Sequence, residues 1–361
     1  MTGGRPSVAV VVPAYNAGGT IIETLRSVSA QTYEDMEILV VDDGSRDNTA
    51  ELVERYQREE PRLRLIRQAN AGVAAARNTG MAHATAPYIA PIDSDDLWHP
   101  TKVEKHVEAL ERNPAAAFAY SPFRIMNGDG RVIDSHPFFA FERRVFFRQL
   151  FFNMVGNGSG MTFRRDAALA MGGYDVTLRD LGLQGCEDWL LQMLLALDHE
   201  VAHVPEYLIG YRKVPGAMSA DTNRMWRSRI LAADILRESA PPSARPLIDS
   251  AKLNFSTRLA FQSLRKTDPR QIVDTVGVSV QLGEVDHLMG EFGEVFVRAR
   301  RTKARRGRPG PKFAEVDPKA LGKNNLSAYT RQWIARLQQA DESPSVFDHP
   351  DEPPVRLSAA R

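Results

Sequence analysis

Three carboxylates at the end of an apolar run are the strongest chemical signal in the sequence. Residues 88–92 form a short apolar run typical of a buried strand, and Asp93-Ser94-Asp95-Asp96 follows directly. Clustered carboxylates repel one another unless a cation lies between them, and Mg²⁺ usually shares such a site with substrate phosphates. The segment therefore indicates a metal and phosphate site. The alternative is a solvated turn in which Asp96 or Ser94 caps the next helix.

The elements around this cluster decide between the two interpretations. Strand and helix patterns alternate along the first 112 residues, which predicts an α/β fold with a mainly parallel sheet and flanking helices. In such sheets the binding crevice lies at the carboxyl ends of the strands, where the loops after Val12, Val41 and Ile92 meet. This placement favours a functional site. The expected strands are 8–12, 38–41, 63–66 and 88–92, and the expected helices begin near Thr20, pass through Leu52, and span 72–83 and 100–112.

The second half of the chain has a different pattern. Asn127-Gly128-Asp129-Gly130 lies between residues 116–126 and 131–133, which predicts a β-hairpin and hence a mixed sheet. An apolar helix is expected over residues 190–197. These elements complete a first domain that we expect to cover residues 1–220.

The remainder of the chain is expected to form a separate, mainly helical region at residues 221–340. Within it, residues 298–312 hold eight Lys or Arg and are expected to be an exposed basic linker. Residues 341–361 are rich in Pro, Asp, Glu and Ser, and we expect a disordered tail there.

The composition of the 361-residue chain narrows the function classes. A net charge of +1 gives no general attraction to nucleic acid, so we expect no nucleic-acid partner. The single cysteine, Cys186, excludes an intrachain disulfide framework and a cysteine-based zinc site. The sequence shows neither a signal peptide nor a run of about 18 apolar residues that could span a membrane. We therefore expect a cytoplasmic protein.

Six segments stand out when the chain is taken in order. They are Val10-Val11-Val12-Pro13-Ala14-Tyr15-Asn16, Val40-Val41-Asp42-Asp43-Gly44-Ser45, residues 70–78, residues 93–98, Gly172-Gly173-Tyr174-Asp175 and Glu187-Asp188-Trp189. In this order and spacing they resemble the family 2 glycosyltransferases. The resemblance covers roughly residues 7–220 and implies a GT-A fold, inverting transfer from a nucleotide-sugar, and a divalent metal, Mn²⁺ or Mg²⁺. A UDP-sugar is the donor that we expect, and a glycan, lipid-linked molecule or small molecule the acceptor.

The resemblance assigns the carboxylate cluster to the metal and the donor. Asp95 matches the usual metal ligand, while Asp93 is expected to contact ribose or assist the metal, and Ser94 lies between them. Asp96 is open to two interpretations, as a ligand or as the cap of the following helix. The metal would neutralise the leaving diphosphate.

Five further positions are expected to bind the donor. Asp43 resembles the aspartate that reads the nucleobase, with a simple turn cap as the alternative. Pro13, Ala14 and Tyr15 are expected to line the same pocket; Tyr15 either stacks on the base or is an ordinary packing aromatic. Arg77 matches a diphosphate-side arginine, and its alternative is a surface salt bridge.

Asp188 is the candidate general base. Inverting transfer needs an acceptor hydroxyl that loses its proton as it attacks, and burial can raise the pKa of a carboxylate toward working pH. Glu187 is its neighbour; because adjacent helical residues do not share a face, one of the two should point elsewhere. Arg212, in Tyr211-Arg212, is expected to reach the diphosphate.

Several properties stay open at the level of sequence. The Gln-x-x-Arg-Trp signature of processive members is absent, which favours a single addition. The aromatic segment 138–152 is interpreted as a core helix and lid, with peripheral contact to the inner face of a membrane as the alternative. A homodimer is possible. The rival functions are a nucleotidyltransferase of similar fold and a catalytically silent sugar-nucleotide-binding scaffold.

Overall fold

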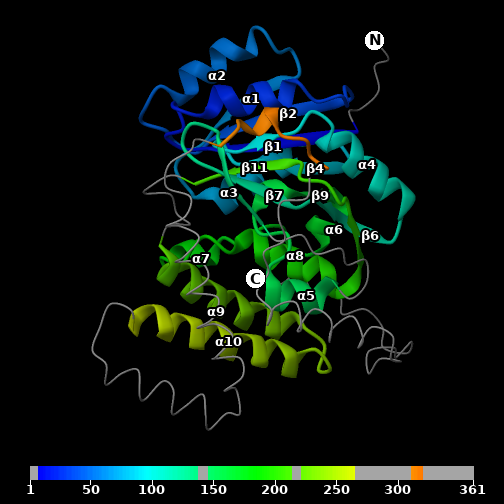
Figure 1. The fold of residues 1–361 in the computed structure, drawn as a ribbon, viewed down its shortest axis with the longest axis vertical. Coiled ribbons are helices and arrows are strands. Elements are labelled where there is room, and N and C mark those ends of the chain that lie inside the picture. The colour runs from blue at the N-terminus through cyan, green and yellow to red at the C-terminus, as the bar shows by residue number, and fades with distance from the viewer. Residues whose placement is uncertain (1–6, 137–144, 214–220, 265–309, 320–361) are drawn as a thin grey trace.

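The computed structural model describes residues 7–136, 145–213, 221–264 and 310–319. Its centre is a seven-stranded sheet (Figure 1). Most pairs are parallel, and β9 runs antiparallel to both of its neighbours. This confirms the expected mainly parallel, mixed sheet. In spatial order the strands are β10 (Glu200–His203), β6 (Ala116–Tyr120), β9 (Met161–Arg164), β4 (Tyr88–Pro91), β1 (Val8–Ala14), β2 (Met36–Asp42) and β3 (Leu63–Arg67).

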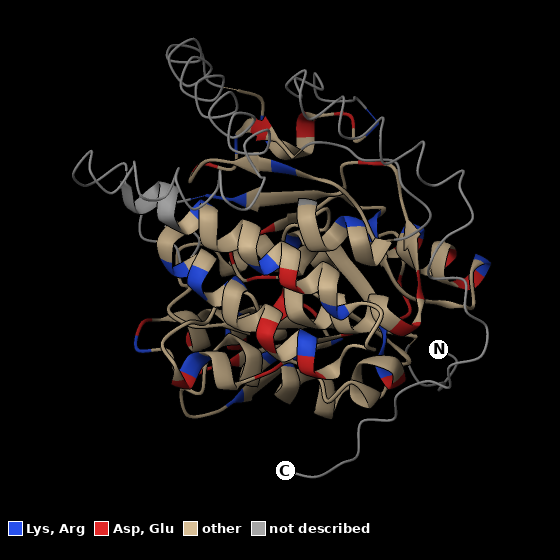
Figure 2. Ribbon diagram, turned by 90° about the horizontal axis from the view of Figure 1, so that it is seen from below, with Lys and Arg blue, Asp and Glu red and all other residues tan. Residues whose placement is uncertain are grey.

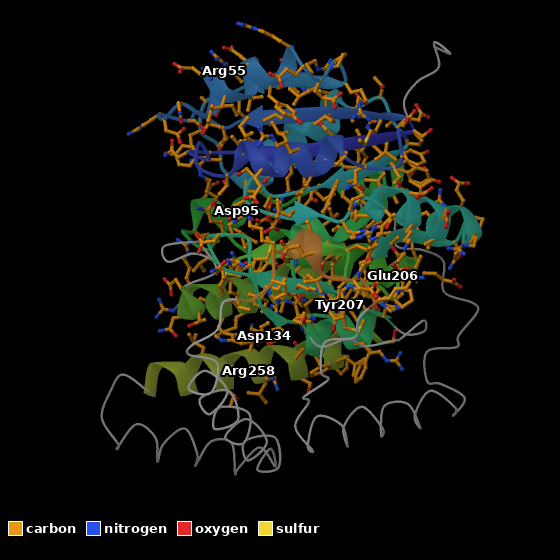
Figure 3. The ribbon with its side chains drawn as sticks, turned by 45° about the horizontal axis from the view of Figure 1, so that its top comes forward. Arg55, Asp95, Asp134, Glu206, Tyr207 and Arg258 are labelled. Atoms are coloured by element: carbon orange, nitrogen blue, oxygen red, sulfur yellow. The ribbon has the colours of Figure 1, made fainter. Side chains whose placement is uncertain are left out.

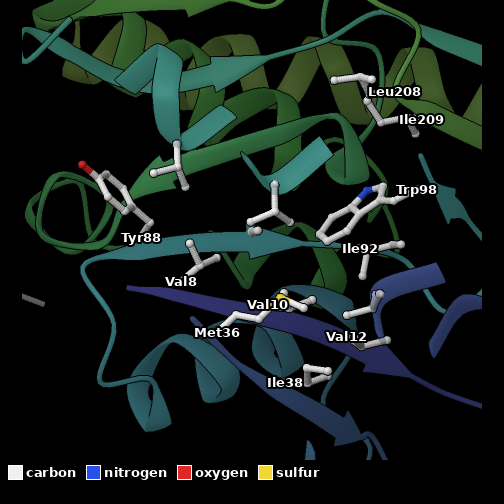
Figure 4. Close-up of a cluster of buried hydrophobic side chains, with 14 of the residues drawn as sticks. Val8, Val10, Val12, Met36, Ile38, Tyr88, Ile92, Trp98, Leu208 and Ile209 are labelled. Atoms are coloured by element: carbon white, nitrogen blue, oxygen red, sulfur yellow. The ribbon is translucent and has the colours of Figure 1, made fainter. Parts of the chain in front are cut away.

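Strand β1 shows why this sheet lies inside the molecule. All seven of its residues are buried, as expected for a central strand of a parallel sheet with both faces covered. Val8, Val10 and Val12 pack on one face with apolar residues of α1 (Ile21–Ser29), α2 (Thr49–Gln57) and α4 (Lys102–Arg112) (Figure 4). Ala9 and Val11 pack on the other face with α3 (Val73–His83) and α8 (Glu187–Asp198). The alternation of side chains along the strand therefore builds two cores.

The first four strands lie within two residues of their expected ends. The helix expected to begin near Thr20 is α1, which starts at Ile21. Thr20 is the N-cap residue, but its side chain makes no capping hydrogen bond, and its Oγ1 instead donates to the Ala17 carbonyl at 3.4 Å.

A second sheet of four strands contains the predicted hairpin. Its order is β5 (Leu97–Trp98), β11 (Ile209–Arg212), β7 (Phe123–Met126) and β8 (Val132–Ser135). The antiparallel pairing of β7 with β8 confirms the hairpin. The expectation of one continuous segment over residues 116–126 is wrong, because the chain leaves the large sheet after Tyr120 and joins the small sheet at Phe123. Pro122, which has no N–H for a ladder, lies at this change.

Residues 310–319 return to the small sheet. Val132 donates its N–H to the Pro311 carbonyl at 2.8 Å, and Lys312 forms an isolated antiparallel β-bridge with Arg131. Phe313 is buried against Leu97 and Met126. The last residues of the predicted basic linker thus contact the hairpin, while residues 298–309 lie outside the described residues.

The remaining helices form a layer below the large sheet in Figure 1. They are α5 (Val145–Phe152), α6 (Arg165–Ala170), α7 (Thr177–Asp180), α8, α9 (Thr222–Ser239) and α10 (Arg245–Leu264). A third core joins α5, α8, α9 and α10, with Trp189 and Phe255 near its centre. Leu150 of α5 lies in this core, as the core-helix interpretation expects; residues 137–144 of the aromatic segment lie outside the described residues.

Basic and acidic residues are interspersed along the helical layer seen from below (Figure 2). Two ion pairs, Arg237 with Asp249 and Lys252 with Asp234, connect α9 to α10. Within the described ranges, none of the helices combines the length and the apolar character that a membrane crossing requires.

Candidate active site

A cleft of about 450 Å³ opens at the carboxyl ends of β1, β2 and β4, and its lining continues onto α7, α8 and α9. Asp95 lies between the N-terminal sheet and the helical layer (Figure 3). All eleven residues expected at the site line this one cleft, although they come from segments far apart in the sequence. They are Pro13, Ala14, Tyr15, Asp43, Arg77, Asp93, Ser94, Asp95, Glu187, Asp188 and Arg212.

Hydrogen bonds from buried groups beneath the cleft fix the turn after β4. Asp96 is fully buried and accepts hydrogen bonds from the Arg212 N–H at 2.9 Å and from Ser159 Oγ at 2.6 Å. Ser159 Oγ also accepts from the Asp93 N–H at 3.0 Å. Burial and the neighbouring carboxylates of Asp95 and Asp93 raise the pKa of Asp96 well above its ordinary value. Both expectations for Asp96 are therefore wrong: it neither faces the cleft nor caps α4, and instead connects three segments beneath the site.

Arg212 supports the same turn through its side chain. Its Nε donates to the Asp95 carbonyl at 2.7 Å, its Nη1 to the Gly128 carbonyl at 2.6 Å, and its Nη2 pairs with Glu23 at 2.6 Å. Only 1% of the side chain is exposed. Arg212 thus fixes the backbone of Asp95 to α1 and to the hairpin turn, and its contact with a diphosphate stays a prediction.

Arg77 connects the turn to α8. Its Nη2 lies 2.6 Å from Asp93 Oδ1 and its Nη1 lies 3.1 Å from Glu187 Oε1. The Arg77 side chain is 4% exposed, so the alternative of a surface salt bridge is wrong. Its guanidinium also lies 5.3 Å from the ring centre of Tyr174. A Cβ at Gly158 would lie 2.7 Å from Arg77 Nη2, so a larger residue there would displace the guanidinium.

The two acidic residues that begin α8 have different environments. Glu187 is buried and accepts from the Gly185 N–H at 2.7 Å in addition to its pairing with Arg77. Asp188 is partly buried and lines the cleft. Burial and the charge of Glu187 raise the pKa of Asp188 to about 6, against the opposing effect of Arg77. Glu187 is thus engaged by Arg77 and the Gly185 N–H, and the expectation that Asp188 points at an acceptor stays a prediction.

Asp95 is the carboxylate best placed to meet a cation. Burial and the adjacent charge of Asp93 raise its pKa to about 6. Among the described residues no group of three or more His, Cys, Asp or Glu is arranged to hold a metal by itself. One or two carboxylates completed by substrate phosphates are a usual Mg²⁺ site. The donor set of Asp95 and Asp93 fits that arrangement.

Asp43 organises the segment that precedes α3. Its carboxylate is buried and accepts from Gln68 Nε2 at 2.7 Å and from the N–H groups of Ala71 and Gly72, both at 2.8 Å. Gly72 has φ +91°, a conformation that favours glycine. A carboxylate has about four lone-pair sites, so one remains for a ligand. Tyr15, 48% exposed at the rim of the cleft, is not a packed core aromatic.

Several residues that line the cleft have no signal in the sequence. Arg179 of α7 donates from Nη2 to Asn70 Oδ1 at 2.7 Å and to the Asn70 carbonyl at 3.1 Å, so it connects the helical side to the segment before α3. Asn157 and Gln184 lie on loops, and Arg229 lies on α9. None of these stands in a motif; only the tertiary fold brings them to the site.

Comparison with known proteins agrees with this architecture. The family model described as glycosyl transferase family 2 matches residues 9–170. A Bacillus subtilis protein named as a putative teichuronic acid biosynthesis glycosyltransferase, TuaG, is 36% identical over 136 residues, which are 37% of this chain and 53% of TuaG. Chondroitin synthase of Pasteurella multocida is 34% identical over 128 residues, which are 36% of this chain and 13% of that protein. The matched region thus spans about half or less of these relatives.

Solved structures share the fold at low sequence identity. Staphylococcus aureus TarS 1–349, in complex with UDP, superposes with a TM-score of 0.53 and 19% identity over 70% of this chain and 71% of that one. The mannosyltransferase PcManGT of Pyrobaculum calidifontis, in complex with GDP-Man and Mn²⁺, gives a TM-score of 0.54 and 20% identity over 78% of this chain and 81% of that one. Residues 9–170 therefore match glycosyl transferase family 2, and the structure shares its GT-A fold with TarS and PcManGT.

Proposed function

We propose that the protein transfers a single sugar from a nucleotide-diphosphate donor, with a UDP-sugar as the first candidate, to a hydroxyl of a glycan, lipid-linked or small-molecule acceptor, with inversion. The observation that carries this proposal is the pairing of two carboxylate sites in one cleft. The turn containing Asp95 and the first turn of α8 containing Asp188 face the same space, and Arg77 joins their neighbours. The UDP and GDP-Man complexes of similar folds support a nucleotide-sugar donor.

The nucleotide would bind along the ends of β1 and β2. Asp43 keeps one acceptor site for a base N–H, and Tyr15 presents an exposed ring on which a base can stack. Pro13 and Ala14 line the same cleft. An unpaired buried acceptor is costly, so a base that donates to Asp43 is favoured over one that does not.

The diphosphate would lie over the turn after β4. Asp95, assisted by Asp93, would hold Mn²⁺ or Mg²⁺ together with phosphate oxygens, and the bound ion would stabilise the charge of the leaving diphosphate. The Mn²⁺ of the PcManGT complex supports a divalent ion in this fold. Arg212 contributes by fixing the main chain of Asp95.

Asp188 would act as the general base. Its carboxylate removes the proton of the acceptor hydroxyl while the hydroxyl oxygen attacks the anomeric carbon from the face opposite the diphosphate. The bond from that carbon to the diphosphate oxygen breaks, and the nucleoside diphosphate leaves with the electron pair. A base is most effective when its pKa lies near the working pH, and the pKa of about 6 suits this role.

A thermal-shift panel tests the donor assignment. UDP-, GDP- and dTDP-sugars are added with and without Mn²⁺ or Mg²⁺ to the wild type, to Asp95→Ala and to Asp198→Ala, an exposed acid of α8 that does not line the cleft. A ligand that binds only the native state raises the melting temperature. The proposal expects a metal-dependent rise with one nucleotide, kept in Asp198→Ala and lost in Asp95→Ala. If no nucleotide raises the melting temperature, the assignment of a nucleotide-sugar donor fails; a rise without sugar transfer would favour the silent scaffold.

A further inference from the structure

The arginines that line the cleft differ in the partners that their guanidinium groups bind. Four arginines line it, and three are committed to neighbours within the protein. Arg77 and Arg212 form ion pairs with acidic side chains, and Arg179 donates to Asn70. For Arg229, no hydrogen bond or ion pair with another described residue is found. The guanidinium of Arg229 therefore keeps its N–H groups for something that enters the cleft.

Arg229 is nevertheless held in place. Its guanidinium carbon lies 5.1 Å from the ring centre of Trp189, 5.8 Å from that of Trp226 and 5.6 Å from that of Phe255. These rings come from α8, α9 and α10, and Trp189 and Phe255 are each about 1% exposed. Cation–π contacts stabilise the charge through the ring faces, which leaves the N–H edge of the guanidinium available. The arrangement is a preorganised cation, whose side-chain entropy is already reduced before a ligand binds.

Helix α9 places Arg229 on the side of the cleft that contains Asp188. Ser228 Oγ donates to the Leu183 carbonyl, and Cys186 Sγ lies 3.6 Å from the Met225 carbonyl, so α9 is docked on the loop that leads into α8. Met225 and Arg229, four residues apart on one helical face, both line the cleft. Asp188 begins the helix that this loop precedes. The nucleotide-side residues lie instead at the ends of β1, β2 and β4.

We propose that Arg229 binds an anionic group of the acceptor, a carboxylate or a phosphate, and so sets the acceptor hydroxyl against Asp188. This inference rests on the proposed function, because it presumes an acceptor in the cleft. The need for such a cation follows from the lining: Asp93, Asp95, Glu187 and Asp188 would repel an anionic acceptor. A guanidinium is suited to either group, since its planar N–H fork matches both carboxylate and phosphate.

Three matched acceptor probes test the inference: p-nitrophenyl glucoside, p-nitrophenyl glucuronide and p-nitrophenyl glucoside 6-phosphate, which differ only at C6. Their dissociation constants are measured in the presence of UDP and Mn²⁺ for the wild type, Arg229→Gln, Arg229→Lys and Arg258→Gln. Arg258 is the control, because its guanidinium lies 5.3 Å from the same Trp226 ring but it does not line the cleft. Charge-assisted hydrogen bonds are strong enough for an effect of about 10- to 100-fold.

The expected result is that one anionic probe binds the wild type about 10- to 100-fold more tightly than the glucoside, and that this preference is lost in Arg229→Gln, partly kept in Arg229→Lys and kept in Arg258→Gln. The probe that binds more tightly shows whether the acceptor group is a carboxylate or a phosphate. Equal binding of all three probes, or a preference that survives in Arg229→Gln, would overturn the inference. UDP affinity should be the same in every variant; if UDP does not bind the wild type at all, the proposed function fails first.

Discussion

The side of the cleft proposed to bind the donor and the side proposed to bind the acceptor, here the donor side and the acceptor side, are built by different means. On the donor side, Asp43 and Asp95 follow buried strands directly, so neighbouring strands and short turns fix their positions. On the acceptor side, Asp188 and Arg229 stand on helices whose positions depend on a core around Trp189. The family match ends at residue 170, before α7, α8 and α9. We therefore expect the donor side and the motif around Asp188 to hold what the family shares, and the rest of the acceptor side, including Arg229, to hold what distinguishes this chain.

The largest expected effect separates chemistry from donor binding. Asp188→Asn should reduce the rate of transfer by about 10²- to 10⁴-fold, because it removes the general base. In the wild type, kcat/KM should fall as the pH drops below about 6, where the Asp188 carboxyl becomes protonated. The measurement is nucleoside diphosphate release with acceptor across pH 5–8. Asp198→Asn, exposed at the other end of α8, should retain activity; full activity in Asp188→Asn would reject the assignment.

The next effect concerns the connection between the two sides. Arg77→Met should destabilise the fold by about 3 kcal/mol, because it leaves the buried Glu187 and the partly exposed Asp93 without their partner. The free energy of unfolding in urea measures this, with Arg55→Met, an exposed position labelled in Figure 3, as the control. A loss no greater than that of the control would mean that the two sides are stable independently.

A smaller change in the free energy of unfolding has the opposite sign to that of Arg77→Met. Folding raises the pKa of Asp188 to about 6, so the ionised carboxylate destabilises the native state above that pH. Asp188→Asn should therefore stabilise the protein by about 1 to 3 kcal/mol at pH 7.5. The gain should diminish as the pH falls through 6 toward 4, because the wild-type carboxyl then becomes neutral too. Urea unfolding at pH 7.5 and pH 4.5 checks this, and a gain that is equal at both would contradict it.

The smallest expected effect lies on the donor side. Asp43→Asn places an amide N–H₂ where Gln68 and the Ala71 and Gly72 N–H groups now donate. Two N–H groups that face each other without an acceptor cost about 1 to 2 kcal/mol, so the free energy of unfolding should fall by that amount. UDP affinity should fall as well. Urea unfolding and UDP titration measure the two quantities. Unchanged values in both would show that Asp43 neither orders this segment nor contacts the nucleotide.

The same difference between the two sides explains how far the sequence predicts this protein. Strands such as β1 and β2 are continuous apolar runs that end in polar loops, so the ends of these strands follow from the local pattern. The position of Asp43 and Asp95 at the same edge of the sheet follows from it too. Asp188 is predictable because it stands in a motif. The role of Asp96 is not, because its burial beneath Arg212 comes from a strand more than a hundred residues away. Arg229 carries no local signal, since two of the three aromatic rings that position it, Trp189 and Phe255, are distant in sequence.

The separation of the two sides is tested most directly by calorimetric titration of UDP with Mn²⁺ into wild type, Asp95→Asn and Asp188→Asn. Both variants should fail to transfer sugar, for different reasons. Asp188→Asn should bind UDP with wild-type affinity, whereas Asp95→Asn should bind it about tenfold more weakly or worse, the loss of one charged ligand. Loss of UDP binding in Asp188→Asn, or its retention in Asp95→Asn, would contradict the division of the cleft into a donor side and an acceptor side.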